Sequence, residues 1–143
     1  VYSILALHMK GLQEEELLCS GRKNKMDIMK DVKVSEHVFA VSDGDFEQKV
    51  LKATLPVIVD FSADWCPPCR VLAPVYRRLS AEYQGRLGFA SVDIDENPLV
   101  YVRYRIQAAP TLIIFKDGKE LARLVGPHPG RLKRAIDGIL TEL

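Results

Sequence analysis

Long apolar runs, excess charge of one sign and cysteine are all scarce in this sequence. No apolar run approaches the roughly 20 residues that span a bilayer, so the sequence predicts no membrane-spanning helix. The 20 basic and 19 acidic residues leave a formal net charge of +1, which argues against a broad binding surface for nucleic acids or anionic membranes. The chain has three cysteines, too few for a disulfide scaffold.

The remaining composition is that of one ordinary domain. Apolar residues make up 48% of the chain and charged residues 27%, both usual for a globular protein. A chain of 143 residues buries enough surface to fold without a metal or a disulfide. Two of the cysteines, Cys66 and Cys69, are separated by only two residues. In a chain that needs no covalent staple, such a pair is typical of redox chemistry or metal binding.

Residues 1–33 differ from the rest and are interpreted as an N-terminal extension, poorly defined or partly helical. The opening run at positions 1–7 is apolar but short, with no basic stretch before it and no clear small-residue cleavage site after it. We therefore do not expect a signal peptide as the sequence is written. The third cysteine, Cys19, is interpreted as an inert thiol, because a lone cysteine usually just packs, with a regulatory thiol as the alternative.

From Val34 onwards, strand and helix patterns alternate. The expected strands are 36–41, 56–61, 87–94, 111–115 and 119–125, the last two joined by an Asp-Gly hairpin turn. The expected helices hold 46–51 behind a cap at Asp43 or Asp45, then the stretch after Cys66, one starting at 97–98 and one through 132–140. This order predicts an α/β domain over 34–143, with a central mixed sheet of about five strands flanked by about four helices.

The Cys-x-x-Cys pair follows the apolar strand 56–61, at a strand end where α/β sheets bind ligands. Thiol–disulfide exchange needs one thiolate that attacks and a second thiol that resolves the mixed disulfide. At the start of a helix, Cys66 is expected to be exposed and to face free N–H groups that lower its pKa. Cys69 is expected one turn further in and more buried. The pattern therefore predicts that Cys66 attacks and Cys69 resolves.

Other uses of a Cys-x-x-Cys pair fit this sequence less well. A zinc site needs two more ligands, and the third cysteine and the three histidines stand at no recognisable spacing. Covalent haem needs a histidine after the second cysteine, where this chain has Arg70. A purely structural disulfide seldom persists in a reducing compartment. We therefore expect no metal and no cofactor beyond the redox-active pair itself.

The segment around the pair resembles the active-site segment of the thioredoxin family. Residues 59–70, Val-Asp-Phe-Ser-Ala-Asp-Trp-Cys-Pro-Pro-Cys-Arg, are similar to the family's V-D-F-W-A-x-W-C-G-P-C-K. Further resemblances follow in the family's order, at Pro74, 93–98, 109–111, 115–118 and 125–126. The resemblance covers roughly 34–143 and implies a thioredoxin fold for that domain.

The resemblance also implies roles for matched positions. Asp60 matches the family's buried aspartate, whose pKa burial should raise, so that it can take the proton of Cys69, directly or through a water. Pro110 matches the family's cis-proline, which leaves the Ala109 backbone free to pair with an extended target segment. The expected apolar patch around the sulfur consists of Trp65, Ala109, Pro110 and Gly126, with Trp65 partly exposed.

Several positions depart from the family pattern or shape the helix. Pro67 and Pro68 replace the usual Gly-Pro; they stiffen the first helical turn but remove two possible N–H donors to the thiolate. Pro74 is expected to kink the helix. Ser62 stands where the family usually has tryptophan, and Ser91 where many members carry a lysine facing the buried aspartate. Arg70 and Asp64 are expected to act on the thiolate in opposite directions.

On this resemblance we expect a cytoplasmic, monomeric protein-disulfide reductase that serves electron transport and cell redox homeostasis. Its partners would be target proteins with disulfides and an electron donor similar to thioredoxin reductase, with no nucleic acid and no membrane. One alternative is an extracytoplasmic oxidoreductase for cytochrome maturation or disulfide shuffling, periplasmic or membrane-anchored if a signal precedes Val1. The other is a non-enzymatic binding module that uses the same fold.

Overall fold

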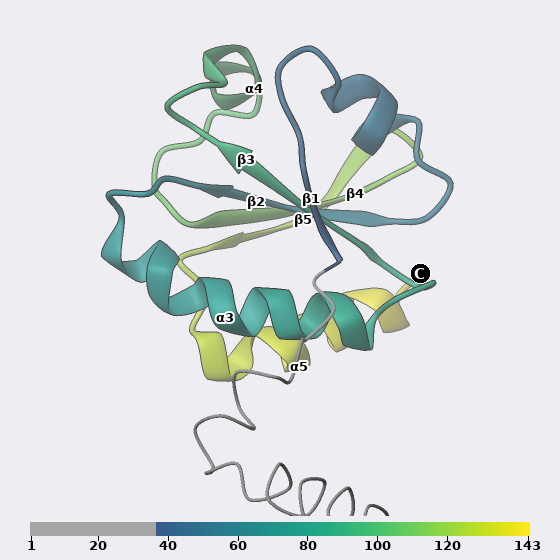
Figure 1. The fold of residues 1–143 in the computed structure, drawn as a ribbon. Helices are drawn as coiled ribbons and strands as arrows, with labels where there is room; N and C mark the ends of the chain where they lie inside the picture. The colour runs from purple at the N-terminus through teal and green to yellow at the C-terminus, as the bar shows by residue number, and fades with distance from the viewer. Residues whose placement is uncertain (1–36) are drawn as a thin grey trace, which may run out of the picture. The chain divides into compact units, whose positions relative to one another are not determined.

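The computed structural model describes residues 37–143 (Figure 1). The predicted N-terminal extension, Cys19 and the domain boundary after residue 33 lie outside the described residues and stay predictions. Among the described residues, no helix has both the length and the apolar character needed to cross a membrane.

Five strands form one mixed sheet. They are β1 (Val38–Ala40), β2 (Val57–Ser62), β3 (Gly88–Asp93), β4 (Thr111–Lys116) and β5 (Lys119–Val125). Their order across the sheet is β1-β3-β2-β4-β5. The pairs β1–β3 and β3–β2 are parallel, whereas β2–β4 and β4–β5 are antiparallel. The predicted mixed sheet is therefore confirmed, with β2 at its centre.

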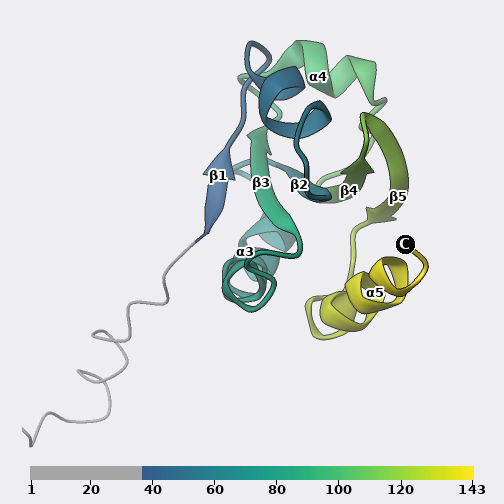
Figure 2. The same cartoon turned by 90° about the vertical axis from the view of Figure 1, so that its right-hand side faces the viewer.

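The helices cover both faces of the sheet. They are the single-turn η1 (Glu47–Leu51), α3 (Pro67–Glu82), α4 (Pro98–Arg103) and α5 (Pro129–Thr141). Two views show α3 and α5 on one face and η1 and α4 on the other (Figures 1 and 2). The buried side chains divide in the same way: Val59 packs on the η1 side, while Ile58 packs among α3 and α5.

The central strand β2 is buried on both faces, as its continuous apolar run predicts. Because side chains alternate along a strand, Val57, Val59 and Phe61 enter one core cluster and Ile58 enters the other. Asp60, which alternates with Ile58, is therefore directed to the face that α3 covers. This alternation places an acidic side chain beneath the helix that carries the cysteines.

The first helical segment differs from its prediction. η1 is a five-residue π-helix with no side-chain cap, although Phe46 and Val50 are buried as expected. Neither candidate capping aspartate caps it. Asp43 instead accepts hydrogen bonds from the N–H groups of Leu99 and Val100 at the start of α4, because those N–H groups have no partner inside the helix.

The first turn of α3 and the hairpin between β4 and β5 match their local sequence signals. Pro67 and Pro68 occupy the first turn of α3, and the helix continues through Pro74; the expected kink there stays a prediction. The hairpin between β4 and β5 turns at Asp117 and Gly118, both with positive φ (51° and 77°), as an Asp-Gly hairpin requires. β1 is shorter than the predicted strand 36–41.

Candidate active site

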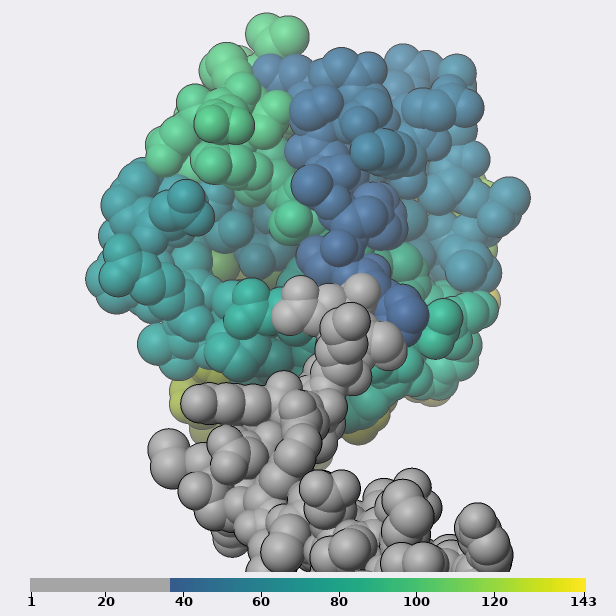
Figure 3. Space-filling model, in the orientation of Figure 1, coloured from purple at the N-terminus to yellow at the C-terminus, as the bar shows by residue number. Residues whose placement is uncertain are grey.

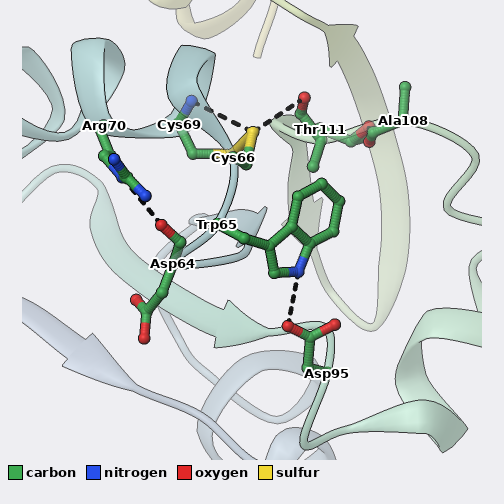
Figure 4. Close-up of a disulfide and its surroundings, with 9 residues drawn as sticks. Asp64, Trp65, Cys66, Cys69, Arg70, Asp95, Ala108 and Thr111 are labelled. Carbon is green, nitrogen blue, oxygen red and sulfur yellow. Dashed lines mark hydrogen bonds between the residues drawn. A yellow bond between two sulfur atoms is a disulfide. The ribbon is translucent and has the colours of Figure 1, made fainter.

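Cys66 and Cys69 lie at the start of α3, just beyond the end of β2 (Figure 4). Cys66 is the N-cap residue of the helix, and its Sγ accepts a hydrogen bond from the backbone N–H of Cys69 at 3.3 Å. The two side chains form a disulfide, with Cα atoms 5.3 Å apart. A helix N-terminus that aims an N–H group at sulfur stabilises negative charge on it.

The two prolines determine which donor reaches the sulfur. Pro67 and Pro68 stand between the N-cap and Cys69, and neither has a backbone N–H. The Cys69 N–H is therefore the first backbone donor of the helix, and it is the one that contacts Cys66 Sγ. The sequence prediction that the prolines remove two donors agrees with this arrangement.

The predicted exposure of Cys66 is wrong for the oxidised pair. Cys66 is 2% exposed and Cys69 is 5% exposed, so Cys69 is not the more buried of the two. The carbonyl oxygen of Ala109 lies 3.4 Å from Cys66 Sγ, and Ile94 and Ala109 pack against the two cysteines. The burial arises from chain segments far away in sequence, which the local helix-start pattern does not include.

Asp60 is buried beneath the cysteine pair, with 5% of the residue exposed. Burial raises the pKa of its carboxyl to about 7, while a hydrogen bond from the Ser62 side chain acts to lower it. Asp60 Oδ1 has no hydrogen-bond partner within residues 37–143. The predicted burial and raised pKa of Asp60 are confirmed, and a carboxyl with this pKa can take up and release a proton near neutral pH.

Asp60 and Cys69 line the same cleft, which has a volume of about 330 Å³. Ser62 and Ser91 also line it. The sequence shows both serines as departures from the family pattern but gives neither a function. The strand register pairs Asp60 with Ser91, in agreement with the family resemblance, which places position 91 opposite the buried aspartate. Ser62 follows Asp60 by two residues on β2 and is therefore directed to the same face.

Trp65 lies on the surface beside the disulfide, as expected, and is 63% exposed. Its indole Nε1–H donates to Asp95 Oδ2 at 2.8 Å (Figure 4). Trp65, Ile94, Tyr101 and Ala109 line a second cleft of about 410 Å³. In the space-filling view, α4 (green) lies directly above the teal segment that leads into α3. Both segments are therefore exposed on the same side of the molecule (Figure 3).

Of the other residues in the predicted apolar patch, Ala109 contacts the disulfide, and Pro110 and Gly126 are tied to each other. The Ala109–Pro110 peptide bond is cis, which confirms that expectation. Pro110 is buried, and its carbonyl accepts a hydrogen bond from the Gly126 N–H at 2.8 Å. Since the Ala109 carbonyl lies 3.4 Å from Cys66 Sγ, the residue before the cis bond lies against the start of α3.

Arg70 and His128 both make local structural contacts. Arg70 Nε donates to the backbone carbonyl of Asp64 at 2.9 Å (Figure 4). His128 caps α5, because its Nδ1 accepts the N–H of Gly130. In the part of the chain that the structure describes, no group of three histidine, cysteine or acidic residues could hold a metal ion. The predicted lack of a metal and of a cofactor stays a prediction.

Comparison of the sequence with known proteins finds one matching family model and several similar proteins. The family model described as Thioredoxin matches residues 37–138. The chain is 46% identical to the thioredoxin of Pseudomonas aeruginosa over 93 residues, which cover 65% of this chain and 86% of that protein. It is 46% identical to thioredoxin 1 of Synechococcus elongatus over 90 residues (63% and 84%). It is 41% identical to a thioredoxin of Staphylococcus aureus over 92 residues (64% and 86%).

Proposed function

Because this chain belongs to the thioredoxin family and is a thioredoxin-type disulfide oxidoreductase, we propose that it reduces disulfides in target proteins through Cys66 and Cys69. The observation that carries the proposal is the disulfide at the start of α3, where the Cys69 N–H contacts Cys66 Sγ. This contact stabilises a thiolate on Cys66 once the disulfide has been reduced. Cys66 is therefore the attacking residue, and Cys69 is the resolving one.

The proposed reaction moves two electrons in two exchange steps. In the first step, the Cys66 thiolate attacks one sulfur of the target disulfide, forms a mixed disulfide and releases the other target sulfur as a thiolate. In the second step, the Cys69 thiolate attacks Cys66 Sγ, restores the Cys66–Cys69 disulfide and releases the second target sulfur. Both released thiolates take up protons, so the target gains two thiols and the protein loses two.

Asp60 is proposed to accept the proton that Cys69 loses before the second step. Three observations support this role: Asp60 is buried below the pair, shares a cleft with Cys69, and has a pKa raised to about 7. An ordinary carboxyl with a pKa of 3.8 would be too weak a base for a thiol. A base whose pKa lies near the working pH is the most effective proton acceptor.

The target segment is proposed to bind in extended form along Ala109, flanked by Trp65, Pro110 and Gly126. A segment that pairs with the Ala109 backbone lies next to Cys66 Sγ, since the Ala109 carbonyl is 3.4 Å from that sulfur. Main-chain pairing gives affinity without demanding one target sequence. Pro67, Pro68 and Pro74 are proposed to shape the helix that carries the cysteines.

The finer parts of the function rest on the family likeness and stay proposals. They are the electron donor, similar to thioredoxin reductase, the monomeric state, the cytoplasmic location and the direction of electron flow. The extracytoplasmic alternative uses the same chemistry with another partner. The binding-module alternative predicts that the disulfide is not needed, and the following experiment tests it.

Insulin reduction tests the proposal with the full chain. With dithiothreitol as the electron donor, wild-type protein is expected to accelerate the precipitation of insulin chains, because it transfers electrons faster than the small dithiol. The Cys66→Ser variant is expected to leave the rate at that of dithiothreitol alone. If wild-type protein gives no acceleration with any dithiol donor, the reductase proposal is wrong.

Replacing Trp65 by alanine tests the proposed target surface. Since Trp65 is 63% exposed beside the disulfide, its loss should lower kcat/KM for insulin by about tenfold or more, through KM, as loss of a central interface tryptophan does. Reduction of a small aromatic disulfide, which needs no extended surface, should change little. Leu121→Ala, an exposed apolar residue on β5, is the control. Equal losses for both substrates would assign Trp65 to the chemistry instead of to binding.

A further inference from the structure

The surroundings of Asp60 raise the question of how its proton reaches solvent. The residue is only 5% exposed, and Oδ1 has no hydrogen-bond partner among residues 37–143. A buried oxygen without a partner is costly, so this atom requires water or another donor. A base that is to be used in every turnover must also lose its proton between turnovers.

Two serine hydroxyls flank this carboxyl because of the way the strands pair. Asp60 and Ser62 are two residues apart on β2, so both are directed to the face that α3 covers. In the parallel register of β2 and β3, Asp60 pairs with Ser91 and Ser62 pairs with Asp93. Small hydroxyl side chains therefore stand on two sides of the carboxyl, and the Ser62 hydroxyl acts to lower the pKa that burial raises.

The space next to these side chains is open. The cleft of about 330 Å³ has Asp60, Ser62, Ser91 and Cys69 on its walls. Ser62 and Ser91 are partly exposed, and the neighbouring Asp64 and Arg70 are exposed. A polar cleft of this size has room for several waters with hydrogen-bond partners on its walls. It leads from the buried carboxyl to the surface of the protein.

We propose that Ser62 is a positioning residue that holds the ionised carboxylate of Asp60, and that Ser62 and Ser91 line a water-filled path through which Asp60 exchanges its proton with solvent. The inference rests on the proposed function, because it assumes that Asp60 accepts the proton of Cys69. It assigns a role to both serines, which do not exchange disulfides.

The proton balance of the step is closed without a further reactant. Cys69 gives its thiol proton to Asp60 and attacks Cys66 Sγ as a thiolate; the bond from Cys66 to the target sulfur breaks. Asp60 then passes the proton to a water in the cleft, held between the Ser62 and Ser91 hydroxyls. The target thiolate takes a proton from solvent, so protons are conserved and the electron pair stays with the sulfurs.

The other groups that face Asp60 or the cleft come from α3, β3, β4 and the loop after β2. From α3, the hydroxyl of Tyr76 donates to the carbonyls of Ile58 and Ala90. From β4, the residue paired with Asp60 is the apolar Leu112. The remaining titratable or charged groups on the cleft walls are Cys69 and Arg70 from α3, Asp64 from the loop after β2 and Asp93 from β3. Arg70 Nε is engaged by the Asp64 carbonyl.

The test is the pH profile of the second exchange step in Ser62→Ala, Ser62→Thr and Ser91→Ala. Reduced protein is mixed with a disulfide-containing peptide, quenched with acid at intervals, and the decay of the mixed disulfide is followed by mass spectrometry. At pH 7, Ser62→Ala should slow this decay by about three- to tenfold, the effect of one hydrogen bond. Its profile should shift to higher pH, because the carboxylate has lost a stabilising donor.

The variants and controls distinguish loss of the Ser62 hydroxyl from other causes of a slower decay. Ser62→Thr keeps the hydroxyl and should restore the wild-type profile, whereas Ser91→Ala should slow the decay with a smaller shift. Thr54→Ala, an exposed residue outside the cleft, should change nothing. If Ser62→Ala has the wild-type profile while Asp60→Asn is slow, the inference is overturned and the proposed function stands. If Asp60→Asn matches wild type, the proton-acceptor role itself is wrong.

Discussion

Replacing Cys69 by serine is expected to stop the reaction at the mixed disulfide. The attacking residue Cys66 remains, so it can still bond covalently to a target sulfur, but nothing can resolve that bond. Turnover of insulin should fall by about three orders of magnitude or more, as with other losses of a reacting group. A covalent complex with the target should accumulate and be visible on a non-reducing gel, and dithiothreitol should dissolve it.

The complementary variant tests the assignment of the two cysteines. Cys66→Ser should also lose turnover but should form no such complex, because the remaining Cys69 is not at the N-cap position, where a backbone N–H of the helix stabilises a thiolate. Equal trapping by both variants would contradict the order in which Cys66 attacks and Cys69 resolves. The double variant Cys66→Ser with Cys69→Ser controls for complexes formed through Cys19.

Replacing Asp60 by asparagine is expected to make the oxidised protein more stable above neutral pH. The folded carboxyl has a pKa of about 7, against an ordinary value of 3.8. Between these two pH values the unfolded chain has lost the proton and the folded chain keeps it, so wild-type stability falls as the pH rises. A shift of about three units corresponds to about 4 kcal/mol. Urea unfolding at pH 8 should therefore favour Asp60→Asn by an amount of this order.

The pH dependence distinguishes this effect from a general change in packing. Near pH 4 both the buried carboxyl and its amide replacement are uncharged in the folded state, so the two proteins should unfold at similar urea concentrations. Asp117→Asn, in the exposed hairpin turn, should follow the wild type at every pH. Parallel stability curves for wild type and Asp60→Asn from pH 4 to pH 8 would show that the Asp60 carboxyl is not the group responsible.

The features that the sequence predicts well are those set by neighbouring residues. The apolar run before the cysteines predicts a central strand, and β2 is buried on both faces. The Asp117-Gly118 pair predicts the hairpin turn that joins β4 to β5. An acid inside the apolar run predicts a buried carboxyl, and Asp60 has the raised pKa expected for it. The cis bond before Pro110 follows from the family resemblance, since no local pattern predicts it.

The features that the sequence does not predict depend on contacts between distant segments. Cys66 is buried because Ala109 lies over its sulfur, although a helix-start pattern alone predicts exposure. Asp43 leaves η1 uncapped because the start of α4, more than 50 residues later, offers free N–H groups to its carboxylate. The cleft that Asp60, Ser62, Ser91 and Cys69 line together is defined only by the assembled sheet and helix, although the family resemblance already places position 91 opposite the buried aspartate.

The most direct test of the central claim is a count of thiols in a single turnover. Fully reduced protein would be mixed with an equimolar peptide disulfide at pH 7, quenched, alkylated and analysed by mass spectrometry with peptide mapping. The account predicts early adducts through Cys66 alone, followed by a Cys66–Cys69 disulfide and two new thiols in the peptide for each protein molecule. Adducts through Cys69, or peptide thiols that appear while Cys66 and Cys69 both stay alkylatable, would contradict it.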